Sequence, residues 1–163
     1  MPAPKVHPLV AIARNELGVH ETSRNRGPGI EKYWTATNYG MEGYRNREPW
    51  CAAFVAWCVC MHLGWEAKRP KSAAVSKWVP DALRLGWKVF GPRDPLLFPR
   101  AGDIFTLSAV SHIGIVADYT GLDVITIEGN TDDEGSREGR EVARRKRSLN
   151  AIRSFIRIPE AKA

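Results

Sequence analysis

One continuous apolar segment constrains the fold of this chain more than any other feature. Residues 51–63 read Cys-Ala-Ala-Phe-Val-Ala-Trp-Cys-Val-Cys-Met-His-Leu, and Gly64 follows as a helix stop signal. A helix that is apolar on every side must be buried at the centre of a domain. The chain has 163 residues, 44% of them hydrophobic, which is enough to form one hydrophobic core around such a helix. We expect a single domain over residues 1–163, with its core at about 8–158.

The order of the remaining signals predicts an α+β fold. Apolar residues at helical spacing predict one helix over residues 8–18, with Gly18 as its stop signal, and another over residues 73–85. Residues 22–49 are predicted to be mostly loop, with a short helical turn near Tyr33. After Gly86 the pattern changes to short β-type runs with short connections, which favours helices packed on an antiparallel sheet of five or six strands. The runs are 87–90, 103–107, 112–119, 122–128, 141–148 and 152–158.

Cys51 is the first candidate for chemistry because it follows a polar loop and opens the apolar helix. Free backbone N–H groups and the helix dipole in a first turn favour a thiolate, the nucleophilic form of cysteine. The alternative is that Cys51 is a small core residue, as we expect for Cys58 and Cys60. Three clustered cysteines cannot form a disulfide framework, so we expect reduced thiols.

A cysteine nucleophile needs a base, and the chain has four histidines. His62 lies eleven residues beyond Cys51 on the same helix, about 16 Å away. His7 lies in a proline-rich start and His20 in a polar stretch. His112 therefore remains as the candidate base, at the start of a predicted strand; a structural strand histidine is the alternative.

The next strand supplies a partner for His112. If the hairpin is symmetric about Thr120, Glu128 lies opposite His112 on the same face and orients its imidazole. A change of one residue in register would place Gly129 there instead. Asn130, two residues beyond Glu128, either adds a second hydrogen bond on that side or is a turn residue.

Four motifs in order resemble the CHAP family, the cysteine- and histidine-dependent amidohydrolases and peptidases. They are Pro-Trp-Cys-Ala-Ala-Phe-Val at 49–55, Ala-Gly-Asp-Ile at 101–104, Ser-His-Ile-Gly-Ile-Val at 111–116 and Ile-Glu-Gly-Asn-Thr at 127–131. The resemblance implies a small papain-like fold and hydrolysis of amide bonds in peptidoglycan. It also implies that Cys51 is the nucleophile and His112 the base, followed by Glu128 and Asn130.

These roles predict thioester chemistry without a cofactor. The Cys51 backbone N–H is one expected donor to the oxyanion, and Asn46 is a guess for a second. Trp34, Tyr44 and Trp50 either line the substrate groove or belong to the core. Some family members have an aspartate-rich calcium loop before the cysteine, but residues 22–49 contain no aspartate. We therefore predict no metal site.

The net charge of +6 is confined to the end of the chain. Residues 137–163 contain 9 basic and 3 acidic side chains, which leaves 15 of each sign before them. The basic strands at 137–158, with the run Arg144–Arg147, are either a solvated sheet edge or a surface attracted to an anionic cell envelope. On this reading, neutralising Arg144–Arg147 weakens wall association and spares cleavage of a small substrate.

The expected function is that of a peptidoglycan amidase or endopeptidase, acting as a phage lysin or as a secreted antibacterial effector. The alternatives are a catalytically idle wall-binding module, a transamidating acyltransferase and a nucleic-acid-binding domain, for which no motif is present. The start of the chain shows no signal peptide, so we expect synthesis in the cytoplasm and delivery to the wall by another machine. We expect a monomer that binds peptidoglycan and interacts with a delivery system or an immunity protein. We expect no binding to nucleic acid.

Overall fold

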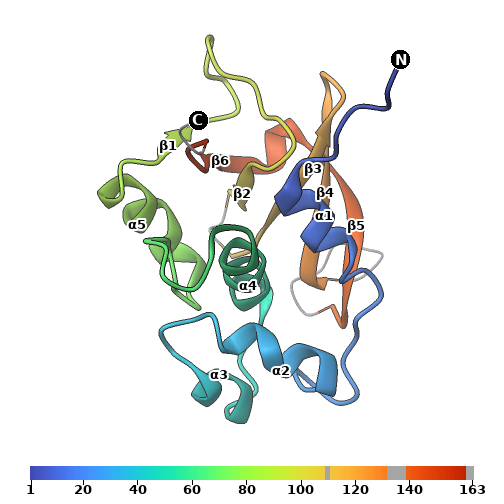
Figure 1. Cartoon of the computed structure of the whole chain (residues 1–163), viewed down its shortest axis with the longest axis vertical. Coiled ribbons are helices and arrows are strands. Elements are labelled where there is room, and N and C mark those ends of the chain that lie inside the picture. The colour runs from blue at the N-terminus through green and yellow to red at the C-terminus, as the bar shows by residue number, and fades with distance from the viewer. Residues whose placement is uncertain (109–110, 132–138, 161–163) are drawn as a thin grey trace.

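The computed structural model describes residues 1–108, 111–131 and 139–160. Helices and strands follow one another along the chain as the sequence predicts, helices first and strands second (Figure 1). The helical elements are α1 (Pro8–Arg14), α2 (Pro28–Trp34), α3 (Met41–Arg45), α4 (Cys51–Leu63), the 3-10 turn η1 (Val75–Lys77) and α5 (Trp78–Arg84). The strands are β1 (Lys88–Phe90), β2 (Ile104–Leu107), β3 (Ile113–Tyr119), β4 (Asp123–Thr131), β5 (Glu141–Ser148) and β6 (Ile152–Arg157), with the 3-10 turn η2 (Leu149–Ala151) before β6.

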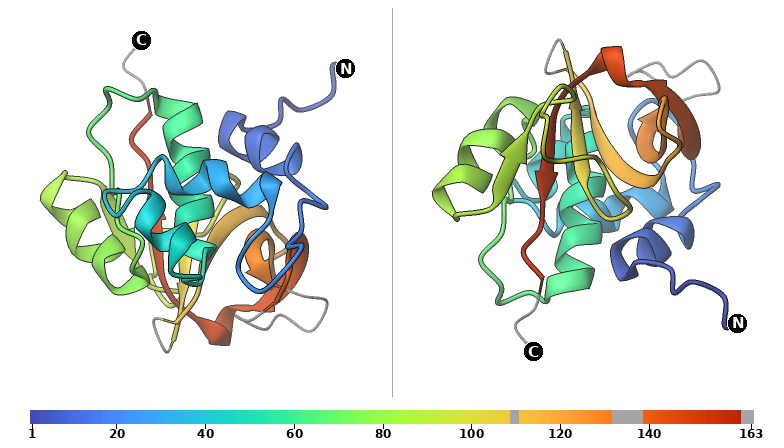
Figure 2. Two further views of the ribbon diagram at one scale, coloured as in Figure 1. Left: turned by 90° about the horizontal axis from the view of Figure 1, so that it is seen from below. Right: turned by 90° about the horizontal axis from the view of Figure 1, so that it is seen from above.

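The six strands form one antiparallel sheet in the order β1-β6-β2-β3-β4-β5. Helices α1 and α4 both contact β3 and β4, so they lie on the same side of the sheet, and α2 packs on α4 from outside (Figure 2). Helix α5 covers the edge of the sheet at β1 and β6. The prediction of an α+β fold with helices packed on an antiparallel sheet is confirmed.

Helix α4 begins at Cys51 and ends at Leu63, as predicted. Its first six side chains are all buried, because α1 and α2 cover it on one side and the sheet on the other. Gly64 ends the helix with φ 97°, a left-handed conformation that favours glycine. The all-apolar pattern therefore marks the element around which the other helices and the sheet pack.

The opposite face of the sheet carries a second apolar cluster, formed by Phe90, Phe105, Val116, Val124, Ile152 and Phe155. Phe90 and Phe155 stack with ring centroids 5.4 Å apart. Because both faces of the sheet carry apolar clusters, several polar side chains of β2 and β4 are buried, among them Thr106, Thr126 and Glu128. Such groups require internal hydrogen-bond partners.

Several local predictions were incomplete. Residues 22–49, expected to be mostly loop, contain both α2 and α3. The helix expected over 8–18 ends at Arg14, although Gly18 does adopt a positive φ of 88°. Residues 73–85 form η1 and α5 in place of one helix. Short helices stabilised mainly by tertiary packing leave a weak signal in the sequence.

The predicted register of the β3–β4 hairpin was wrong. Val116 pairs with Thr126, two residues from the expected Val124, and the register shifts again before Asp118 pairs with Ile125. Ala117 is the extra residue of this bulge. A shift of two residues leaves each side chain on its expected face, which explains why the site below still forms.

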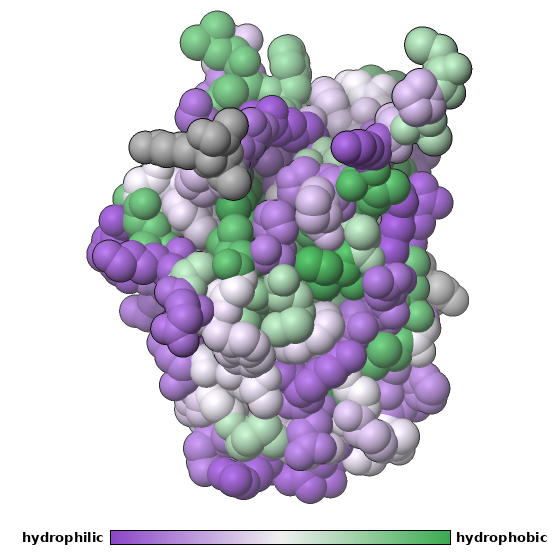
Figure 3. Space-filling view, viewed as in Figure 1, coloured by the Kyte–Doolittle hydropathy of each residue, from purple (hydrophilic) through white to green (hydrophobic). Residues whose placement is uncertain are grey.

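The surface in Figure 3 is mostly hydrophilic on the face shown, with apolar residues in small patches. None of the helices within the described ranges is long and apolar enough to cross a membrane.

Candidate active site

Cys51 lies at the junction of α4 and the end of β4. The residue is 2% exposed. Gly129 of β4 lies directly against this first turn, since a Cβ atom there would come within 2.8 Å of the Phe54 and Trp50 side chains. Glycine at 129 therefore lets the strand approach the helix closely enough to bring Glu128 and Cys51 into one site.

His112 and Glu128 form a buried pair, with 2.7 Å between His112 Nε2 and Glu128 Oε1. Both side chains are almost fully inaccessible to solvent. Gly114 makes room for the pair, because a Cβ at that position would lie 2.8 Å from Glu128 Cγ and 2.6 Å from the Phe105 ring. The sequence prediction that Glu128 meets the imidazole is confirmed as a contact, although the two residues are not directly opposite in register.

Burial by itself would raise the pKa of Glu128, but the Arg147 guanidinium and His112 outweigh it. Hydrogen bonds and charge from these two groups lower the Glu128 pKa to about 2. Thr126 Oγ1 donates a further hydrogen bond to Glu128 Oε2 at 2.5 Å. The carboxylate is therefore ionised at neutral pH despite its burial.

Burial alone would lower the pKa of His112, but hydrogen bonds and charge from Cys51 and Glu128 raise it to about 9. Because Nε2 faces Glu128, Nδ1 is the ring nitrogen left for the thiol. Nδ1 is buried and has no hydrogen-bond partner within the described residues. The imidazole thus lies between a thiol and a carboxylate, an arrangement that allows it to carry a proton between reaction steps.

Asn130 does not bond to the imidazole, so the predicted second hydrogen bond to His112 was wrong. Its Oδ1 accepts the Trp50 backbone N–H at 2.8 Å, and its Nδ2 donates to the Gly139 carbonyl at 2.6 Å. Asn130 also has φ 55°, which turns the backbone at the end of β4 and directs its amide toward α4. Its role is to fix the residue before Cys51 to the sheet.

The predicted aromatic groove does not form as expected. Trp34 and Trp50 are both fully buried, and Trp50 stacks on Tyr33 and donates its Nε1–H to Glu21. These two rings belong to the core, so their assignment to a groove was wrong. Tyr44 is partly buried and remains a prediction.

The predicted second oxyanion donor also remains a prediction. Asn46 Nδ2 donates to the Tyr39 hydroxyl at 3.2 Å in an exposed position. The backbone N–H of Cys51 has no hydrogen-bond acceptor in the part of the chain that the structure describes.

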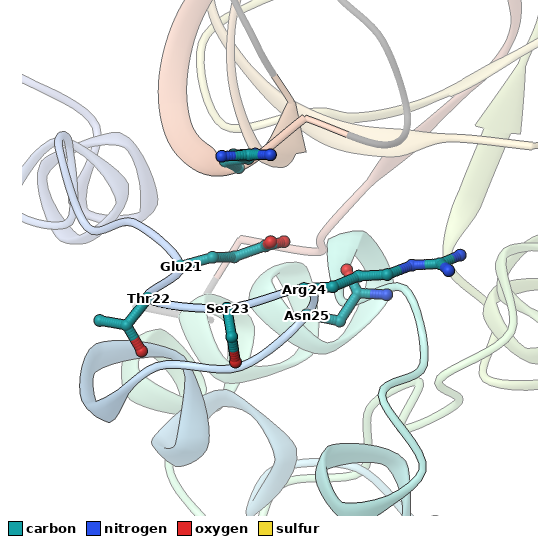
Figure 4. Close-up of a pocket in the computed structure, with 6 residues that line it drawn as sticks. Glu21, Thr22, Ser23, Arg24 and Asn25 are labelled. Carbon is teal, nitrogen blue, oxygen red and sulfur yellow. The ribbon is translucent and has the colours of Figure 1, made fainter.

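A polar pocket of about 320 Å³ lies along the loop before α2 (Figure 4). Glu21, Thr22, Ser23, Arg24 and Asn25 line it along one loop, and Arg140 completes it. Both walls connect to the site: Glu21 accepts the Trp50 ring N–H at 2.9 Å, and Asn130 bonds to Gly139, the neighbour of Arg140. A ligand in this pocket would lie beside the residues that position Cys51.

The other predicted features lie outside this site. His62 is at the far end of α4 with its ring 5.6 Å from that of His7. All three cysteines are unpaired. Across residues 1–108, 111–131 and 139–160, no group of three or more His, Cys, Asp or Glu side chains gathers as metal ligands do.

Arg147 is the site residue that the sequence reasoning missed. It was assigned with Arg144–Arg147 to a surface separable from cleavage, but its guanidinium contacts Glu128. The predicted separability stays a prediction, and this contact argues against it for Arg147. Strand alternation was the available signal, since it divides Arg145 and Arg147 from Arg144 and Lys146.

The structure thus combines an α+β fold with a cysteine at a helix start and a buried histidine that has a carboxylate partner. The CHAP domain family model matches residues 43–130, more than half of the chain. The protein belongs to the CHAP domain family. The match includes Cys51, His112 and Glu128 and ends before Arg147.

Two solved structures have a similar fold. The crystal structure of Ly7917 aligns with a TM-score of 0.58 and 17% identity over 94% of this chain and 62% of that chain. The crystal structure of Ly7917 with the hydrolyzing product of MDP aligns with a TM-score of 0.54 and 17% identity, over 95% and 63%. This chain thus spans less than two thirds of the Ly7917 chains. Comparison with the curated proteins gave no match.

Proposed function

We propose that this protein is a peptidoglycan hydrolase that cleaves an amide bond through Cys51. The observation that carries the proposal is the buried imidazole of His112, which has Glu128 at Nε2, an unpartnered Nδ1, and a pKa raised by the neighbouring Cys51 and Glu128. Membership of the CHAP family supports a cysteine hydrolase. The hydrolysis product in one Ly7917 structure supports a cell-wall substrate.

The mechanism follows from the protonation states. With the His112 pKa near 9, the imidazolium form prevails at neutral pH and stabilises a neighbouring thiolate. The thiolate attacks the amide carbon, and the C–N bond breaks as His112 gives its proton to the leaving amine. The neutral imidazole then takes a proton from water, whose oxygen attacks the thioester and releases the acid and the thiolate.

In this cycle Glu128 orients the imidazole of His112 and stabilises its positively charged imidazolium form. Its fixed contact at Nε2 keeps the ring oriented, so that Nδ1 stays directed at the thiol during both proton transfers. The Cys51 backbone N–H is the donor that we assign to the oxyanion. Asn130 contributes indirectly, because it ties Trp50 and the start of α4 to β4.

We assign the polar pocket beside Trp50 to the part of the substrate next to the scissile bond. Arg24 and Arg140 line it together with Glu21, which suits a peptide stem with carboxylate and amine groups. The scissile bond is then the N-acetylmuramoyl–alanine amide or a stem or cross-bridge peptide bond. The new end groups of the products distinguish these bonds.

The decisive test is digestion of purified sacculi, followed by mass spectrometry of the soluble fragments. Cys51→Ala should lower fragment release by about a thousandfold or more, because the nucleophile is lost. Cys60→Ala is the matched control, since it removes a thiol from the same helix outside the site. Fragment release by Cys51→Ala at the rate of the unmodified protein would refute the nucleophile. Binding without release would favour the wall-binding module, and newly joined peptides would favour transamidation.

This function places the action of the protein at the cell wall, in the setting of a phage lysin or of a delivered antibacterial effector. Expression in a bacterial host, with and without a fused export signal, tests the location. Lysis is expected only with export and only with Cys51 intact. Lysis from the cytoplasmic form alone would contradict the need for delivery.

A further inference from the structure

Arg147 makes the most extensive contact with Glu128. Its Nε donates to Oε2 at 2.8 Å and its Nη2 donates to Oε1 at 2.5 Å. The two side chains are 14% and 0% exposed. This two-point contact fixes both the position and the plane of the carboxylate, which a single point charge does not.

The pairing of β4 and β5 explains how Arg147 reaches the site. Arg147 is opposite Val124 and Ala143 is opposite Glu128, so the arginine side chain extends along the sheet face toward the carboxylate. Ala143 leaves that space open because its side chain is short. Arg145, on the same face opposite Thr126, makes no ion pair with Glu128 in the described structure.

Both carboxylate oxygens of Glu128 accept hydrogen bonds, and only Oε1 faces the imidazole of His112. Oε2 accepts from Arg147 and Thr126, whereas Oε1 accepts from Arg147 and His112. The charged groups around the carboxylate are thus Arg147 from β5 and His112 from the residue before β3, and Cys51 of α4 acts on the imidazole. Without the guanidinium, the buried carboxylate would keep the hydroxyl and the imidazole as its partners.

We propose that Arg147 is a positioning residue for the cysteine–histidine site: it holds the Glu128 carboxylate in the orientation in which Oε1 faces His112 Nε2. This inference rests on the proposed function for its catalytic consequence, but its geometric content concerns Glu128 and His112 alone. Part of the basic strand β5 therefore belongs to the site. Arg147 acts through Glu128 and has no assigned contact with substrate.

Loss of Arg147 should change how the site titrates. Burial then raises the pKa of Glu128, because the hydrogen bond from Arg147, the strongest influence that lowers this pKa, is removed. A carboxylate that protonates at higher pH stops stabilising the imidazolium, and the imidazolium stops stabilising the thiolate. The acidic limb of Cys51 reactivity should therefore move to higher pH.

Three variants test the proposal. Arg147→Met removes the charge and keeps an apolar stem, and Arg147→Lys keeps a charge without the two-point contact. Arg144→Met is the matched control, because it removes the same charge from an exposed position of the same strand. Circular dichroism and urea unfolding establish that each variant is folded.

The first readout is the rate of Cys51 alkylation by iodoacetamide against pH, with the labelled peptide identified by mass spectrometry. In Arg147→Met the acidic limb should shift upward by about one pH unit or more. Arg147→Lys should shift less, and Arg144→Met should match the unmodified protein. An unshifted limb in folded Arg147→Met overturns the proposal; if that variant does not fold, an unshifted limb in Arg147→Lys does so.

The second readout is kcat and KM on a soluble peptidoglycan fragment. Arg147→Met should lower kcat about tenfold or more and leave KM within about twofold, because an oriented base is lost and substrate binding is not. A change confined to KM would contradict a positioning role. Alkylation needs no substrate, so a shifted limb without any peptidoglycan cleavage would retain this inference and reject the proposed function.

Discussion

Within the described residues, two buried arginine–carboxylate pairs beside the sheet are alike in chemistry and differ in their other contacts. Arg147 makes a two-point contact with Glu128, and Arg157 makes one with Asp103 through distances of 2.8 Å. Both arginine side chains are 14% exposed and both carboxylates are almost completely buried. The ion pair alone therefore does not distinguish a site from a structural support.

The difference lies in what else each carboxylate contacts. Asp103 Oδ2 accepts the backbone N–H of Arg100, and Arg157 also donates to the Phe98 carbonyl, so this pair fastens the loop before β2 to β6. Glu128 has an imidazole at its remaining position. A buried ion pair is a candidate for a chemical role when one of its carboxylate oxygens also faces a titratable group such as an imidazole.

The largest effect that tests this comparison is on activity. Glu128→Gln keeps the shape of the side chain and removes its charge, so kcat/KM on a soluble fragment should fall about a hundredfold or more. Asp103→Asn is the matched change in the other pair. It should leave kcat/KM within about threefold and lower the free energy of unfolding in urea by about 3 kcal/mol, since it leaves Arg157 without its charge partner.

Equal losses of activity in the two variants would break the comparison. Such a result would mean that the loop held by Asp103 contributes as much to turnover as the imidazole partner does. Both proteins are measured well below their unfolding midpoints, so that a loss of folded protein is not counted as a loss of activity.

A second effect is on stability against pH. The Glu128 pKa is about 2 in the folded protein against an ordinary 4.5, so its contribution is present above about pH 4.5 and is lost as the pH falls toward 2. The His112 pKa is about 9 against 6.5, so its contribution is complete below about pH 6.5 and is lost as the pH rises toward 9. Each contribution is on the order of 3 kcal/mol.

Urea unfolding at several pH values checks this expectation. Stability should be greatest between about pH 4.5 and 6.5, and both flanks should be shallower in Glu128→Gln, because glutamine neither titrates nor balances an imidazolium. The difference between the two proteins isolates Glu128 from the other carboxylates. The same pH dependence in both would contradict the assigned ion pair.

The smallest effect concerns the space that the pair occupies. Gly114→Ala should lower the free energy of unfolding by about 1–3 kcal/mol and reduce turnover, because the new Cβ overlaps Glu128 Cγ and the Phe105 ring. Gly91→Ala is the control, since a Cβ there meets nothing within 4 Å. An equal effect in both variants would show that the gap at Gly114 is not specific to the pair.

Much of the fold could be predicted because it depends on local patterns. The all-apolar segment gave α4 its two ends, and alternation located the six strands to within a few residues. The same alternation placed His112 and Glu128 on one face, and this survived the error in register because a shift of two residues preserves the face. The bulge at Ala117 had no marker in the sequence.

The partners of polar side chains were harder to predict. Asn130 follows Glu128 by two residues, but its positive φ turns its amide away from the imidazole and toward Trp50. In the sequence Arg147 is one of four consecutive basic residues, and its place in that run does not by itself identify it as a site residue. Only the pairing of β5 with β4 brings it to Glu128. Long side chains reach residues several positions away, so their contacts depend on the approach of distant segments.

The sequence by itself determined the central helix α4, the order of helices before strands and the candidate site residues Cys51, His112 and Glu128, because hydrophobic periodicity and helix or turn signals act over short distances. The tertiary structure decided the hairpin register, the burial of Trp34 and Trp50, and the division of one basic strand into an exposed face and a face that contributes Arg147. These outcomes depend on how the strands and α4 pack, and a buried charge is tolerated only where that packing supplies its partner.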